Sequence, residues 1–166
     1  MAGITEKRTV GEVKEILKAF LSDMGIEIIQ EMERGYDWGF WVRFGNFPLL
    51  IQNQKDACYS VIVLHISVTD EASILRLNEM YDRNDAQAVF ELTRAFTTPL
   101  TGFSRIVQRG KVTGFAVTKY IFPYHEGFSI EDFDAALQAV VSVGAVGVTY
   151  LKTIVHDMCL EHPAEA

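Results

Sequence analysis

The sequence predicts an α+β fold, in which a twisted antiparallel sheet of five to six strands is packed by three helical segments. Apolar residues recur at helical spacing near both ends of the chain and again after Asp70. Between these regions they alternate with a period of two, or form short continuous runs, as strands do. Glycine and proline separate the runs. The predicted order is α-β-β-β(-β)-α-β-β-α, in a single domain over 1–166 with its core over about 10–158.

The first helix is predicted to begin after Thr9 and to end before Gly25. Thr9 and Glu12 have the spacing of a capping box, and Gly25 stands where a helix is closed by glycine. One face of this segment is apolar and the other is charged, which is typical of a helix that packs on a sheet.

An antiparallel meander is predicted next, with a turn at 34–37, a short strand at 49–52 and a central strand at 58–68. In the strand after the turn, one face carries Trp38, Phe40, Val42 and Phe44. Trp41 lies on the opposite face. If the aromatic stripe faces the core, Trp41 is exposed or covered by a partner, unless a helix of the same chain covers that face as well.

A second helical region, capped by Thr69 or Asp70, is predicted to end before Pro99. The weak helix formers of "YDRND" mark either a break between two helices or an exposed turn. A hairpin with its tight turn at Gly110 follows, and Pro123 ends its second strand.

The last helix is predicted to begin after Ser129 and to run from about Ile130 to Met158. It contains a charge-free run, Ala135–Leu151, which is shorter than the ~20 apolar residues of a membrane span, so no membrane association is expected. Its small residues indicate close packing, either on the chain's own sheet or, on a second face, against another copy. The predicted dimer-interface residues are Ser142, Gly144 and Gly147.

The layout of these elements resembles the type III secretion chaperone-like fold, which includes the YbjN-like proteins. The most similar segment is "GFSRIVQRGKVTGFAVTKYIFPYHEGFSIEDFDAAL", a hairpin followed by a turn and a capped helix. The resemblance implies a small, acidic, cytoplasmic protein that binds other polypeptides without enzymatic activity and is often a homodimer. It supplies no catalytic residue, and the strand at 49–52 and the "YDRND" interruption leave the subfamily open.

Composition excludes several classes of partner. The formal net charge of −7 disfavours nucleic acid and anionic lipid, both of which require a basic surface. The N-terminal segment has no apolar stretch of the kind found in signal peptides. Cys58 and Cys159 are the two cysteines and form no motif, which favours a reducing cytoplasm.

No pattern of catalytic or metal-binding residues stands out, and no cofactor is expected. His156, Cys159 and His162 could be metal ligands, but positions six apart on a helix do not converge on one ion. The "YDRNDAQ" segment lacks the glycine and the distal glutamate of a calcium loop. Ser104 has no catalytic motif around it, and His65 is interpreted as a core histidine.

Charge is distributed unevenly near the hairpin. From Leu92 to His125 there are five basic residues and no acidic ones. This pattern fits either a solvated strand face whose lysines discourage edge pairing or a docking face for an acidic peptide or helix. The candidate partner-binding residues are Trp41, Arg105, Arg109, Lys111 and Lys119.

Three functions follow from these observations. The favoured one is a non-enzymatic protein-binding module, homodimeric and able to bind another polypeptide. The first alternative is an enzyme or small-ligand-binding protein whose site is built from scattered residues. The second is a structural subunit of a larger complex.

Overall fold

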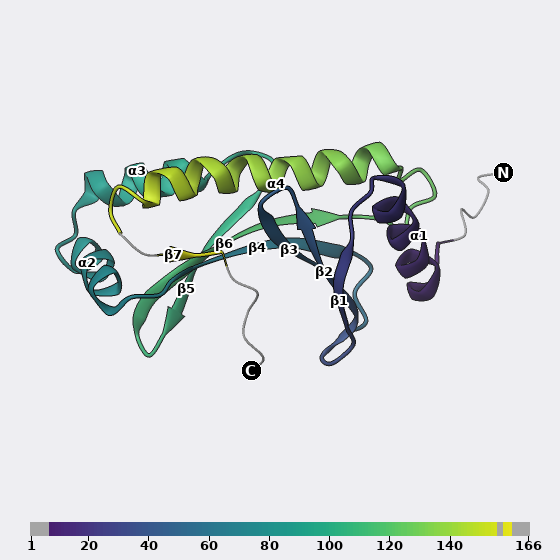
Figure 1. The fold of residues 1–166 in the computed structure, drawn as a ribbon, viewed down its shortest axis with the longest axis horizontal. Coiled ribbons are helices and arrows are strands. Elements are labelled where there is room, and N and C mark those ends of the chain that lie inside the picture. The colour runs from purple at the N-terminus through teal and green to yellow at the C-terminus, as the bar shows by residue number, and fades with distance from the viewer. Residues whose placement is uncertain (1–6, 156–157, 161–166) are drawn as a thin grey trace. The chain divides into compact units, whose positions relative to one another are not determined.

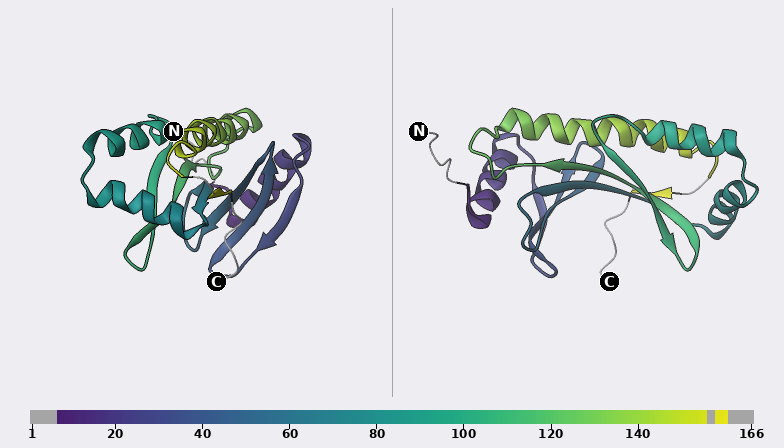
Figure 2. Two further views of the ribbon diagram at one scale, coloured as in Figure 1. Left: turned by 60° about the vertical axis from the view of Figure 1, so that its left-hand side comes forward. Right: turned by 180° about the vertical axis from the view of Figure 1, so that it is seen from behind.

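A computed structural model describes residues 7–155 and 158–160 and shows an α+β fold with four helices and an antiparallel sheet (Figure 1 and Figure 2). The strands lie in the order β1-β2-β3-β4-β6-β5, and β7 pairs with β4 outside this path. The fold class is therefore confirmed. The elements, in chain order, are α1 (Val10–Asp23), β1 (Ile28–Met32), β2 (Tyr36–Phe44), β3 (Phe47–Gln54), β4 (Ser60–Val68), α2 (Glu71–Asp82), α3 (Ala86–Phe96), β5 (Gly102–Gln108), β6 (Lys111–Ile121), α4 (Ile130–Leu151) and β7 (Met158–Cys159).

The chain divides into two compact units, and each unit contains two separate stretches of sequence. The first unit comprises Met1–Ile62 and Tyr120–Gln138, and the second comprises Val63–Lys119 and Ala139–Ala166. The strands β4 and β6 and the helix α4 each contribute residues to both units. The prediction of one domain stays a prediction.

In the first unit, α1 begins and ends as the sequence predicts. The Thr9 hydroxyl accepts from the Glu12 amide, and the Glu12 carboxylate accepts from the Thr9 amide, so both halves of the capping box are present. Gly25 follows with φ +69°, a conformation that favours glycine. The buried residues of α1 are spaced four apart, at Val13, Leu17 and Leu21. They form the apolar face that the amphipathic pattern predicts.

The meander of the first unit has a core of apolar side chains and one buried polar cluster. The strand β2 pairs antiparallel with β1 and with β3. Asn53 of β3 is fully buried, and its side-chain oxygen accepts from the hydroxyls of Ser60 (2.9 Å) and Tyr124 (3.0 Å). Its amide nitrogen donates to the Asp37 carboxylate (3.2 Å). Because its polar atoms have partners, Asn53 is compatible with a buried position.

In the second unit, three stacked rings join a helix to the hairpin. Phe96 of α3 stacks on Phe103 of β5 and on Phe115 of β6, with ring centroids 5.1 and 5.4 Å apart. The "YDRND" segment is a break between α2 and α3, because Asp85 caps α3 by accepting from the Ala88 amide. Of the two expectations for this segment, the break between two helices is therefore confirmed.

The last helix is shorter than predicted. It ends at Leu151, and the amides of Thr153 and Ile154 donate to carbonyls three residues back in a tight turn. The Thr153 hydroxyl also donates to the Tyr150 carbonyl. Three consecutive β-branched residues, Thr153 to Val155, have low helix propensity, which explains why the helix does not continue to Met158. Met158 instead lies in β7, paired with Val68.

Candidate protein-binding surfaces

The helix α4 is buried along one side only. Its buried positions recur at helical spacing, namely Phe133, Ala136, Leu137, Val140, Val143, Gly144, Gly147, Val148 and Leu151. The opposite side is exposed at Ala135, Gln138, Ser142, Ala145, Val146 and Thr149, which we call the α4 outer face. A surface helix normally carries charged residues on its exposed side. The exposed side of α4 carries charge only in its first turn, at Glu131 and Asp132, and the α4 outer face beyond that turn carries none.

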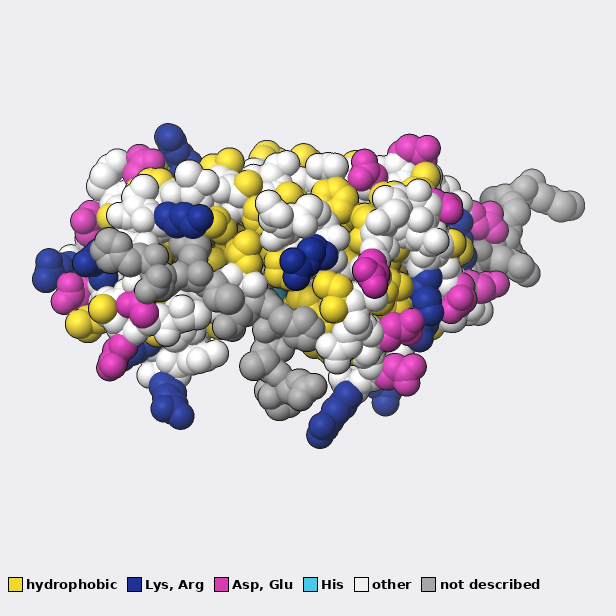
Figure 3. Space-filling model, in the orientation of Figure 1, with side chains coloured by type: hydrophobic (Ala, Val, Ile, Leu, Met, Phe, Trp, Pro, Cys, Tyr) yellow, Lys and Arg dark blue, Asp and Glu magenta, His cyan; other side chains and the backbone are white. Residues whose placement is uncertain are grey.

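The α4 outer face is apolar at its centre. Val146 is 60% exposed, and a shallow depression of about 500 Å³ is lined by Ala145, Val146, Thr149, Tyr150 and Thr153. In Figure 3, yellow and white surface follows α4 along the upper edge, and acidic side chains gather near the N-terminal end of the helix. Among the described residues, α4 is the one helix long and apolar enough to cross a membrane, and 44% of its most apolar window is buried. Core helices of soluble proteins pass the same test.

Two of the three predicted dimer residues do not lie on this outer face. Gly144 and Gly147 are buried. A Cβ at Gly147 would overlap the ring of Phe96, so this glycine allows α3 and α4 of the same chain to approach closely. The assignment of Gly144 and Gly147 to a dimer interface is therefore corrected, because their side of the helix packs inside the chain. Ser142 is exposed, as that assignment requires.

The basic hairpin presents an edge strand. β5 is the last strand in the sheet order, and Ser104, Arg105, Val107 and Gln108 are exposed. The Arg105 guanidinium lies 5.1 Å from the centre of the Tyr81 ring of α2, at the distance of a cation–π contact. Burial raises the pKa of Tyr81, and the charge of Arg105 opposes this shift.

The hairpin turn places two of the candidate basic residues close to α2. Arg109 and Gly110 have φ values of +51° and +78° in the tight turn. Arg109 and Lys111 are exposed and line a depression of about 340 Å³, together with Gln108 and Thr113 of the hairpin and Thr69, Glu71 and Ile74 beside it. Lys119, on β6, is half-buried. The structure thus brings Arg109 and Lys111 together.

Trp41 is not an exposed aromatic. It is 1% exposed, and its indole N–H donates to the Met32 sulfur at 3.1 Å. The expectation that Trp41 is available to a partner is corrected, because other parts of this chain cover its ring. Both faces of β2 are buried at its centre. The alternation of residue types along one strand does not show whether its second face is buried as well.

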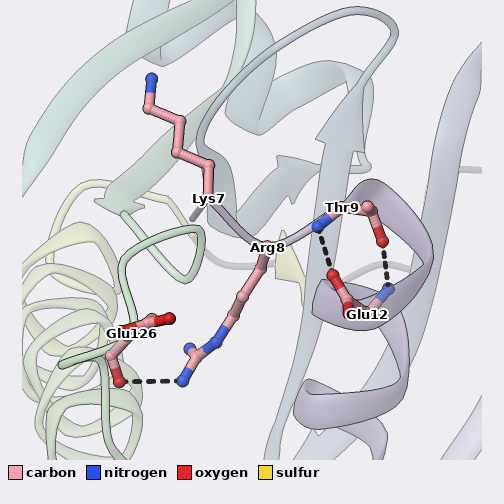
Figure 4. A pocket seen from close by; sticks show the side chains of 5 residues that line it. All are labelled: Lys7, Arg8, Thr9, Glu12 and Glu126. Carbon is pink, nitrogen blue, oxygen red and sulfur yellow. Dashed lines mark hydrogen bonds between the residues drawn. The ribbon is translucent and has the colours of Figure 1, made fainter. Parts of the chain in front are cut away.

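A depression of about 430 Å³ at the start of α1 is lined by Lys7, Arg8, Thr9, Glu12 and Glu126 (Figure 4). The Arg8 guanidinium donates to the carbonyls of Pro123 and Glu126, both at 2.9 Å, and the Glu12 carboxylate is used by the capping box. Lys7 points away from Arg8 in Figure 4. These contacts tie α1 to the segment before α4, so most polar groups here hold the fold together.

His65 lies in β4, half-buried among apolar neighbours in the strand. Burial lowers its pKa below the ordinary value of 6.5. The folded chain therefore disfavours the imidazolium, and the unfolded chain binds the proton first as the pH falls.

Folding stability is therefore expected to decrease as the pH falls below about 6.5 and to level off once the folded state is protonated as well. The slope from one histidine is at most about 1.4 kcal/mol per pH unit. Urea unfolding from pH 8 to pH 5 should show this component in the unchanged protein and in His125→Gln, whose histidine is exposed. It should be absent from His65→Gln. Equal pH dependence of all three proteins would refute the assignment.

The described part of the chain contains no group of three or more His, Cys, Asp or Glu side chains placed to hold a metal ion. His156 and His162 lie outside the described residues, so the expectation that they do not share a metal ion with Cys159 stays a prediction. The "YDRNDAQ" acids Asp82 and Asp85 end α2 and cap α3.

Comparison with known proteins gives a fold and no family. No protein-family model matches the chain, and no curated protein matches it in sequence. The structure is similar to the crystal structure of an uncharacterized protein from Methanothermobacter thermautotrophicus, with a TM-score of 0.68 and 12% sequence identity. The match covers 86% of this chain and 99% of that chain. At this identity the likeness shows the fold alone.

Sequence reasoning missed the exposed side of α4. It singled out the glycines as the interface because they are the smallest residues, whereas the exposed positions are Ala145, Val146 and their neighbours on the outer face. The spacing of the apolar residues along the helix contained this information. The position of Phe133, four residues after the cap, fixes which side packs inward and therefore which side faces outward.

Proposed function

We propose that this protein is a non-enzymatic protein-binding module that works as a homodimer, with the α4 outer face as the contact between subunits. The observation that carries the proposal is the absence of charge from the exposed side of α4 between Ala135 and Thr149. Exposed apolar surface of this kind marks interaction sites. In a chain of net charge −7, an uncharged face is also where a second copy meets the least repulsion.

Charge at the two ends of α4 favours an antiparallel pair. Glu131, Asp132 and Asp134 lie at the N-terminal end, and Lys152 follows the C-terminal end. Antiparallel pairing would place the acidic end of each helix near the lysine of the other and would oppose the two helix dipoles. The midpoint of the uncharged segment lies next to Ser142, so we place the two-fold axis there. Ala135 of one copy then lies opposite Thr149 of the other.

Disulfide trapping tests this arrangement. In a Cys58→Ser, Cys159→Ser background, Ser142→Cys is expected to form a covalent dimer under mild oxidation, because the two cysteines would face each other across the axis. Ala135→Cys and Thr149→Cys should each form no covalent dimer alone and should form a mixed covalent dimer when the two variants are combined. Efficient trapping of Ala135→Cys by itself would indicate parallel helices. Absence of trapping at all three positions would contradict the interface.

A further inference from the structure

We propose that β5 is a docking edge for an extended, acidic polypeptide segment, which would add a strand to the sheet beside it. This surface is separate from the α4 outer face. The proposal specifies what a protein-binding module of this kind would bind, and it does not depend on whether the module is a dimer.

Among the residues that the structure describes, no strand pairs with the outer edge of β5. β5 stands at the end of the strand order and pairs with β6 along its other side, from Gly102↔Thr118 to Gln108↔Lys111. Every second residue of such an edge directs its backbone N–H and C=O groups outward, where another strand can bond to them. Val107 is 58% exposed, so the edge also offers apolar contact.

The other end of the strand order shows what a protected edge looks like in this protein. At β1, Glu31 pairs with Lys14 (3.3 Å) and Lys18 (2.7 Å) of α1, and Glu33 pairs with Lys14 (3.7 Å). Charged side chains held in this way discourage a further strand. The only charge within β5 is Arg105, and its contact with Tyr81 directs it toward α2. β5 therefore lacks the protection that β1 has.

Charge then selects the kind of segment. The hairpin and its flanks carry Arg94, Arg105, Arg109, Lys111 and Lys119 and no acidic residue between Leu92 and His125. Two carboxylates lie close to this set: Glu71 lines the depression that Arg109 and Lys111 share, and Glu91 pairs with Arg94 at 3.7 Å. The local charge is still positive in a protein that is negative overall. An acidic segment is therefore attracted to β5, and a basic segment is repelled.

The same charge argues against a second copy at this edge. Pairing β5 with β5 of another molecule would bring two basic hairpins together, each with Arg105, Arg109 and Lys111. Like charges placed side by side across strands are destabilising. Nucleic acid would also meet the basic hairpin, but strand addition uses backbone hydrogen bonds that only another polypeptide supplies.

The test uses a fluorescein-labelled peptide of alternating glutamate and valine, with a lysine–valine peptide and single-stranded oligothymidylate as competitors. Fluorescence anisotropy is expected to show binding of the glutamate peptide that weakens as salt is raised. Lys111→Glu should reduce the affinity by about tenfold or more. Arg34→Glu, an exposed charge reversal in the β1–β2 turn, is the matched control and should bind as the unchanged protein does.

Amide hydrogen exchange supplies the backbone readout. Bound peptide should slow exchange at alternate residues within Gly102–Gln108, because only the outward amides gain a partner. Equal affinity for the lysine–valine peptide, displacement by oligothymidylate, or unchanged exchange in β5 would overturn the proposal. Slowing in β5 that rises with protein concentration and without peptide would indicate a second copy there instead. Peptide binding by a protein that is monomeric in solution would support this inference while contradicting the proposed homodimer.

Discussion

Replacing Gly147 with leucine is expected to lower the free energy of unfolding by about 3 kcal/mol, the upper part of the range for an overpacked core. The new side chain would occupy the space of the Phe96 ring. That ring cannot move away cheaply, because it stacks on both Phe103 and Phe115. The gain in helix propensity on replacing glycine, about 1 kcal/mol at most, is too small to compensate.

Urea unfolding at a fixed protein concentration measures this effect, with Gly11→Leu as the matched control. Gly11 also lies in a helix, but a Cβ there meets nothing within 4 Å. Gly11→Leu should therefore be neutral or stabilising. If Gly147→Leu were as stable as the unchanged protein, that result would contradict the close contact between α3 and α4. The side of α4 that carries Gly147 would then be available to a partner after all.

Placing a charge at Val146 is expected to separate the subunits and leave each one folded. Val146→Glu would put a carboxylate into the proposed α4–α4 contact, where position 146 of each subunit lies opposite Gln138 of the other. Burying two unpaired like charges costs several kcal/mol, enough to convert a dimer into monomers at micromolar concentration. Val146 is 60% exposed within its own chain, so the fold should lose less than about 0.5 kcal/mol.

Light scattering after size exclusion gives the mass of the variant, and circular dichroism checks the fold. Ala72→Glu, at an exposed position of α2, is the control and should remain a dimer. A Val146→Glu protein that stays dimeric would place the subunit contact elsewhere. An unfolded variant would show instead that this face of α4 is covered within the chain.

The sequence predicted local structure well because local signals were strong. The Thr9–Glu12 capping box, the turn at Arg109 and Gly110, and the Ser129–Asp132 cap each combine a residue type with a required backbone geometry, and the structure contains all three. The order of elements followed from these boundaries. The far end of α4 was misplaced, since no glycine or proline marks it and propensity over Thr153–Val155 is a weaker signal.

Which side chains are buried by distant segments was much harder to predict than which segments are helices or strands. Trp41 and Gly147 were predicted to lie at interfaces because of their residue types. Both are buried against their own chain. Whether a side chain is covered depends on which distant segment lies over it. For Gly147 that segment is α3, about fifty residues earlier in the chain. The edge position of β5 likewise depends on strand order, which the alternation of residues along each strand does not specify.

Sedimentation equilibrium of the unchanged protein, over a range of micromolar concentrations, measures whether two copies associate. If the α4 outer faces pair, the protein sediments as a species of twice the chain mass of 18.7 kDa, and this species dissociates in the Val146→Glu variant. A single species of 18.7 kDa at every concentration would show that the α4 outer face does not bind a second copy.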